Sequence, residues 1–170
     1  MSSTAIIIIV LVACMALGPV FLLQPSRRQR QLANYRSTAA REGLKVGMSD
    51  YMGDSVATYT LRWPQDSVNK FAVEPIHLTR KEYKHELHIA DYWQVNGKIA
   101  SPQLSNQLTD ILQAVPESVV GMDVNNDGVA LWWKETGGEQ GYQSIKQLLE
   151  SSAQALWPMV SAPRKVVEAD

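Results

Sequence analysis

Cysteine is almost absent from this chain, which has only Cys14 among its 170 residues. A single cysteine excludes an intramolecular disulfide and a zinc site built from cysteines. The sequence also lacks a Walker phosphate-binding loop, a dinucleotide-binding glycine motif and a hydrolase nucleophile elbow. These absences favour a protein that is not an enzyme, and we predict no catalytic residue, no cofactor and no metal ligand.

Charged side chains are missing between Ala5 and Leu23. At about 1.5 Å per helical residue, such a stretch is long enough to cross a hydrocarbon core of about 30 Å. We therefore predict a transmembrane helix over residues 5–23, preceded by a short extracytoplasmic N-terminus at residues 1–4.

Basic residues follow this stretch directly, whereas residues 1–4 carry no charged side chain. Because Lys and Arg stay on the cytoplasmic side of a span, the pattern predicts a single-pass inner-membrane protein with its C-terminal domain in the cytoplasm. Membrane lipid is then a partner, and anionic headgroups would attract the basic side chains that follow the span. These side chains are Arg27, Arg28, Arg30, Arg36 and Arg41.

Two other interpretations of the N-terminus compete with an anchor. A cleaved signal peptide needs a positive n-region and a shorter apolar stretch, and neither is present. Leu11-Val12-Ala13-Cys14 resembles a lipobox, which would make the chain a lipoprotein lipidated at Cys14 with an extracytoplasmic domain. No Lys or Arg precedes this motif and apolar residues follow it, so we place Cys14 inside the predicted helix.

The rest of the chain is acidic. From residue 46 onward there are 10 basic and 16 acidic side chains, a net of −6. Because phosphate contacts need a positive surface, this part of the chain is predicted not to bind nucleic acid.

The chain after the apolar stretch is predicted to form one domain. Ser26 is a suitable cap for a helix that ends near Arg41, and its arginines point in all directions, which indicates a solvated basic juxtamembrane helix within residues 24–45. Residues 46–160 are enough for a single core. The tail at residues 161–170 is predicted to be disordered.

Periodicity within residues 46–160 predicts an α+β fold: a small antiparallel sheet with helices packed on one face, behind the N-terminal transmembrane helix. A helix capped by Ser101 should present Leu104, Leu108, Ile111 and Leu112 to the core, and a second should run from Tyr142 to Trp157 and end at Pro158. The predicted strands are 56–63, 71–78, 87–95, 119–124 and 129–134.

The segment Asp123-Val124-Asn125-Asn126-Asp127-Gly128 resembles the first half of a calcium-binding loop. Its twelfth position is Lys134, where such a loop needs a bidentate acidic residue. The apolar runs on both sides favour a β-hairpin turn, since Asn, Asp and Gly accept turn conformations readily.

Histidines and tryptophans supply the other candidates. His85 and His88 would share one face of a helix and could hold a metal, but their spacing does not supply a third ligand. Trp132 and Trp133 must face opposite sides of a strand, so one is expected to lie in the core and the other nearer the surface. The second tryptophan could contact a partner or be covered by residues 70–100.

Residues 1–45 resemble YajC, the small accessory subunit of the bacterial preprotein translocase. The resemblance consists of an uncharged apolar segment, the run Phe21-Leu22-Leu23-Gln24-Pro25-Ser26-Arg27-Arg28, a short polar helix and Gly43-Leu44-Lys45-Val46. It implies a cytoplasmic domain and an accessory role in a membrane complex.

We therefore expect a non-enzymatic protein whose domain binds another membrane or cytoplasmic protein. The alternatives are an anchored enzyme or metal-dependent module, for which His85 with His88, or Asp123 with Asp127, would be the candidate pairs.

Overall fold

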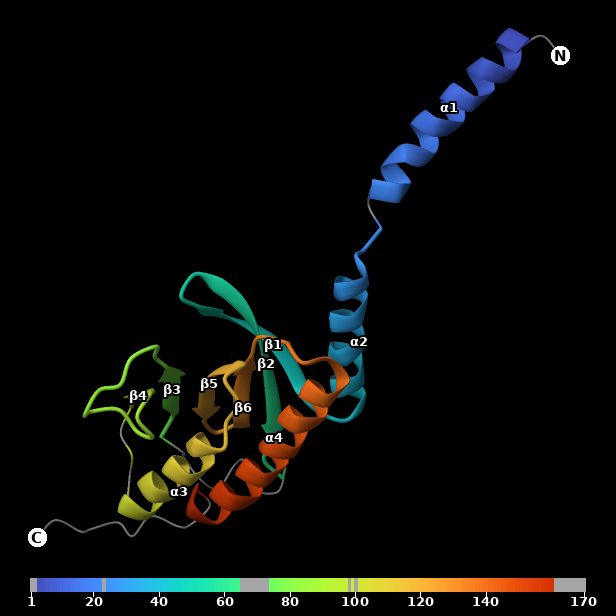
Figure 1. Ribbon diagram of the computed structural model, residues 1–170. Coiled ribbons are helices and arrows are strands. Elements are labelled where there is room, and N and C mark those ends of the chain that lie inside the picture. The colour runs from blue at the N-terminus through green and yellow to red at the C-terminus, as the bar shows by residue number, and fades with distance from the viewer. Residues whose placement is uncertain (1–2, 23, 65–73, 98, 100, 161–170) are drawn as a thin grey trace, which may run out of the picture. The chain divides into compact units, whose positions relative to one another are not determined.

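The computed structural model describes residues 3–22, 24–64, 74–97, 99 and 101–160 (Figure 1). The chain divides into two units, Met1–Asn34 and Tyr35–Asp170. The first contains helix α1 (Ser3–Leu22) and the beginning of helix α2 (Arg27–Arg41). The second contains the rest of the described structure and is called the folded unit below. The tail predicted to be disordered, 161–170, lies outside the described residues.

The main correction concerns the predicted membrane anchor. Crossing a bilayer takes about 20 consecutive, predominantly apolar residues in one helix. Within the described ranges, no helix combines the length and the apolar character that a membrane crossing requires. The predicted transmembrane helix over 5–23, the single-pass topology and the inner-membrane location are therefore wrong.

Helix α2 begins and ends where the sequence predicts. The Ser26 hydroxyl accepts from the backbone N–H of Gln29 at 3.2 Å, and the Gln29 side chain accepts from the Ser26 N–H at 2.8 Å. This reciprocal pair is a capping box. At the other end, Gly43 has a φ of +87°, which lets the backbone turn out of the helix. The helix is not solvated all round, because Tyr35 and Ala39 are buried.

A six-stranded sheet in the order β1-β2-β6-β5-β3-β4 forms the centre of the folded unit, and every neighbouring pair is antiparallel. The predicted α+β class with an antiparallel sheet is thus confirmed. The strands are β1 (Lys45–Tyr51), β2 (Asp54–Arg62), β3 (Ile76–Arg80), β4 (Trp93–Asn96), β5 (Val119–Val124) and β6 (Gly128–Trp133).

Two strand predictions need correction. The strand predicted at 71–78 is β3, which begins at Ile76 and ends at Arg80, and residues 71–73 lie outside the described part. The strand predicted at 87–95 is mostly wrong, because residues 82–92 form bends and turns with only a single bridge, from Ile89 to Trp93. Within that predicted range, the structure has only the start of the short edge strand β4, which begins at Trp93. Ala90 and Asp91 have positive φ values, which a strand does not allow.

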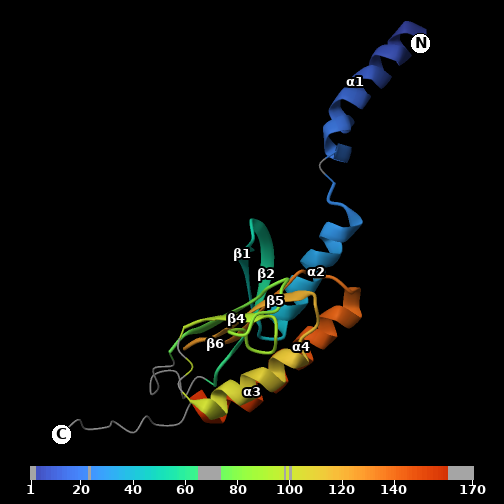
Figure 2. The ribbon, with the colours of Figure 1, turned by 60° about the vertical axis from the view of Figure 1, so that its left-hand side comes forward.

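Helices α3 (Pro102–Gln113) and α4 (Gly138–Val160) lie together on one side of the sheet (Figure 2). Ser101 caps α3 by accepting from the Leu104 N–H at 3.2 Å. The predicted stop at Pro158 is wrong, since α4 continues to Val160; a proline this close to a helix end costs few backbone hydrogen bonds. The two helices and the sheet bury the main core, which includes Tyr59, Leu108, Met122, Leu131, Trp133, Ile145 and Leu149.

The opposite face of the sheet carries a second, smaller apolar cluster of Val56, Val120 and Trp132, with Tyr51 packed against it. Three strands separate β1 from β3, yet the Tyr51 hydroxyl donates to the Arg80 carbonyl at 2.6 Å. The sheet is therefore coiled, so that the tip of the β1–β2 hairpin reaches across this face toward the end of β3.

Candidate functional site

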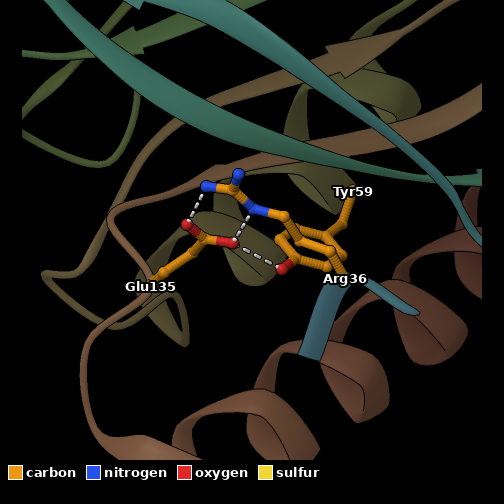
Figure 3. A network of polar contacts seen from close by, with 3 residues as sticks. All are labelled: Arg36, Tyr59 and Glu135. Carbon is orange, nitrogen blue, oxygen red and sulfur yellow. Dashed lines mark hydrogen bonds and ion pairs between the residues drawn. The ribbon is translucent and has the colours of Figure 1, made fainter. Parts of the chain in front are cut away.

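Glu135 is the only charged residue of the described part that is buried. It lies two residues after β6 and has a φ of +53°, a conformation that is unusual for a residue with a side chain. Its Oε1 accepts from Arg36 Nε and from the Tyr59 hydroxyl, both at 2.8 Å, and its Oε2 accepts from Arg36 Nη2 at 2.5 Å (Figure 3). Three donors from α2 and β2 thus converge on one carboxylate.

This arrangement keeps both partners of Glu135 protonated. Burial, helped by the hydrogen bond to Glu135, raises the pKa of Tyr59 far above its ordinary value of 10.0. The hydrogen bond to the same carboxylate raises the pKa of Arg36. A carboxylate that is saturated by donors which do not titrate near neutral pH is suited to holding elements together, and not to transferring protons.

A second contact joins the end of α2 to α4. The Tyr142 hydroxyl donates to Glu42 Oε2 at 2.5 Å, and Lys146 Nζ lies 3.2 Å from the same oxygen. The hydrogen bond from Tyr142 is the main reason why the pKa of Glu42 is lowered. The rings of Tyr35 and Tyr142 stack with centroids 6.1 Å apart. Together these contacts and the Glu135 contacts form what we call the α2 clamp, and they fix residues 35–42 to the folded unit.

The clamp changes the interpretation of the basic segment. Arg36, which the sequence assigned to the membrane surface with four other arginines, is partly buried and pairs with Glu135. Arg27, Arg28, Arg30 and Arg41 are exposed. No local sequence pattern points to the pair, because Arg36 and Glu135 are 99 residues apart.

The two adjacent tryptophans face opposite sides of β6, as predicted. Trp133 is completely buried on the helix-covered face, against Tyr59. Trp132 lies on the opposite face and is only 8% exposed, because its ring lies directly over Gly121, where a Cβ would come within 2.6 Å of it. Neither indole protrudes from the folded unit, and His77, which lies within residues 70–100, packs against Trp132. A partner contact through one of these tryptophans stays a prediction.

The predicted hairpin at 125–128 is confirmed. Asn125 and Gly128 exchange backbone hydrogen bonds, and Asn125 Oδ1 accepts from the Asp127 N–H at 2.8 Å. The carboxylate of Asp123 points instead to its own partners: Oδ1 contacts His77 Nδ1, and Oδ2 accepts from Trp132 Nε1 at 2.8 Å. Asp123 and Asp127 therefore have separate surroundings, and Asp127 pairs with Lys45 at 3.6 Å.

His77 is the residue that sequence reasoning overlooked on the face opposite the helices. Its ring packs against Trp132 with centroids 4.7 Å apart and pairs with Asp123, so its orientation is fixed from two sides. Such a carboxylate–imidazole pair can orient a general base. In the described part of the chain, however, no Ser, Thr or Cys side chain forms a hydrogen bond with this ring, so the pair lacks a nucleophile.

His85 and His88 come together, but in a turn and not on a helix. Their ring centroids are 5.5 Å apart, and His85 Nδ1 accepts from the Leu87 N–H at 3.2 Å. Among the side chains that the structure describes, no three His, Cys, Asp or Glu residues are grouped so that they could hold a metal ion.

No protein-family model, no curated protein and no solved structure matches this chain. The resemblance of residues 1–45 to YajC therefore stays a prediction.

Proposed function

We propose that this protein is a protein-binding accessory subunit whose helix α1 inserts into an apolar site of a larger partner. The observation that carries this proposal is the exposure of α1. Seven of its large apolar side chains are between 50% and 71% exposed: Ile6, Ile7, Ile8, Val10, Leu11, Val12 and Met15. An exposed apolar surface of this extent is a common sign of an interaction site.

The arrangement of these side chains indicates what kind of partner would fit. Successive helical residues are about 100° apart, so Ile6, Ile7 and Ile8 alone point in three widely separated directions. A flat surface could cover only one of them. A partner that encloses the helix, such as a pocket between its own helices, could cover all of them over the rise of about 14 Å from Ile6 to Met15.

Most large apolar side chains described in the folded unit are buried against one another, and the α2 clamp fixes the helix that leads into it. The exposed ones lie at separate places along the chain: Met48, Met52, Tyr83, Leu87 and Met159. We infer that α1 provides the attachment and that the folded unit is the part presented by the complex. The YajC resemblance agrees with an accessory role, and the absence of enzymatic activity stays a prediction.

Site-specific photo-crosslinking in cells tests the proposal. A photoreactive phenylalanine analogue in place of Ile7 should give a discrete adduct with a partner protein, and Leu11→Glu on the same chain should abolish it, since a charge would have to be buried. The same analogue in place of Gln31, an exposed polar position of α2, is the matched control. An adduct with lipid alone, or an equal adduct from Gln31, would contradict the proposal.

A further inference from the structure

A groove of about 400 Å³ opens at one end of the sheet, where the tip of the β1–β2 hairpin meets the end of β3. Val120 near the start of β5 and Lys134 just after β6 line it, together with Lys81 and Glu82 from the segment after β3. We call it the basic groove. It is lined by Tyr51, Arg80, Lys81, Glu82, Tyr92, Glu117, Val120 and Lys134.

Positive charge is concentrated at this groove. Within residues 46–160 the structure describes six Lys or Arg side chains, and three of them, Arg80, Lys81 and Lys134, line the basic groove. Ion pairs within 4.0 Å to a described carboxylate occupy Lys84 and Lys146 but none of these three. Unpaired cations gathered in one depression of an acidic domain indicate an anionic ligand.

Two of the cations are held in place by aromatic rings. The Arg80 guanidinium lies 5.9 Å from the centre of the Trp93 ring, and its Nη1 donates to the Pro116 carbonyl at 3.3 Å. Lys134 Nζ lies 5.9 Å from the centre of the Tyr51 ring. A cation over an aromatic face keeps its remaining N–H donors available, so a ligand carboxylate would meet charges that are already positioned.

Two acidic side chains limit the type of anion. Glu82 and Glu117 line the same groove, so a continuous polyanion such as nucleic acid would be repelled at two points. A peptide whose carboxylates are spaced along an extended backbone can place them beside the cations and its neutral residues beside Glu82 and Glu117. Tyr51 and Tyr92 add apolar surface and hydroxyl groups for such a chain.

We propose that the basic groove binds an acidic, extended peptide segment of a partner protein, with its carboxylates at Arg80, Lys81 and Lys134. This inference rests on the proposed role in protein binding and adds a second contact, which is polar and separate from α1. The two contacts fail independently, because a charge change in the groove leaves the apolar side chains of α1 as they are.

Fluorescence anisotropy of the full chain with labelled peptides tests the groove. A short glutamate-rich peptide should bind, and a lysine-rich peptide of equal length should not. Each of Lys81→Gln and Lys134→Gln should weaken binding about three- to fivefold, and both together about tenfold, as expected for partly exposed charge pairs. Arg62→Gln is the matched control, since Arg62 is exposed, carries the same charge and does not line the groove. Raising the salt concentration should weaken binding further.

Several results would overturn the inference. These are an absence of glutamate-peptide binding, an equal loss in Arg62→Gln, and equal binding of the lysine-rich peptide. Tighter binding of a single-stranded oligonucleotide would show a site for polyanions, and displacement by inorganic phosphate at low concentration would show a site for small anions. The two proposals can be told apart by crosslinking from position 7 in a chain that carries both Lys81→Gln and Lys134→Gln. If the adduct is retained while peptide binding is lost, the groove is impaired and the attachment by α1 is intact.

Discussion

Similar apolar side chains are exposed in helix α1 and buried in the folded unit. In the folded unit, Leu108, Leu131 and Leu149 are completely buried by other parts of the same chain. In α1, Leu11 and Ile7 are more than half exposed. The same residue types are thus buried in one region and exposed in the other. The proposed role of α1 in binding a partner would account for this contrast.

The largest change in stability is expected when a core side chain is shortened, and shortening an α1 side chain provides the comparison. Leu149→Ala should lower the free energy of unfolding by about 2–5 kcal/mol, because it leaves a cavity between α4 and the sheet. Ile7→Ala should change it by less than about 0.5 kcal/mol, as surface substitutions do. Urea unfolding of both full-length variants, followed by tryptophan fluorescence, measures the two values. Similar losses in both would show that α1 belongs to the core.

The α2 clamp marks where the folded unit begins, and Glu135 is its centre. Glu135→Gln removes the charge that Arg36 pairs with and leaves the buried Tyr59 hydroxyl with a weaker acceptor. We expect a loss of about 1–3 kcal/mol, the range for an unsatisfied buried polar group. Glu150→Gln, at an exposed position on α4, is the matched control and should have little effect. If α2 were only a solvated stalk, the two substitutions would have equal effects on thermal unfolding.

The same clamp predicts how stability depends on pH. The pKa of Tyr59 in the folded state is raised above 10.0, mainly by burial, and that of Tyr142 is raised for the same reason. Stability from these hydroxyls is therefore complete below pH 10 and is lost as the pH rises above it, because the unfolded chain releases those protons first. Melting temperatures measured from pH 8 to 11 should fall at the alkaline end. Tyr59→Phe should be less stable at neutral pH but should show a smaller alkaline decline; an unchanged decline would disprove this assignment.

A smaller loss of stability is expected when Asp123, on the face of the sheet opposite the helices, is replaced. The hairpin interpretation alone predicts that Asp123→Ala changes stability little. The structure predicts a loss of about 1 kcal/mol, because His77 and Trp132 lose their shared acceptor. Asp127→Ala, whose carboxylate makes only an exposed ion pair, is the control. Equal melting temperatures for the two variants would show that the contacts to Asp123 contribute nothing.

Local patterns explain which features could be predicted. The Ser26 and Ser101 caps, the Leu104–Leu112 helix face and the 125–128 turn each depend on residues within a few positions of one another, and all are present. Arg36 with Glu135, and His77 with Asp123, are joined only by the fold, 99 and 46 residues apart. No periodicity encodes such pairs.

Two of the wrong predictions failed for different physical reasons. Residues 87–95 are rich in strand-forming side chains, but the positive φ values at Ala90 and Asp91 turn the chain there. The predicted span relied on the absence of charge over a stretch of sufficient length, and no described helix meets the length and apolar character that a span requires.

Light scattering by the full chain, compared with Leu11→Glu, tests the central claim most directly. If α1 is an attachment that the fold does not use, the unmodified chain should self-associate when purified without its partner, because its apolar side chains are exposed. The Leu11→Glu chain should be monomeric and should unfold at the same urea concentration. A monomeric unmodified chain, or a Leu11→Glu chain whose folded unit is destabilised, would contradict the account.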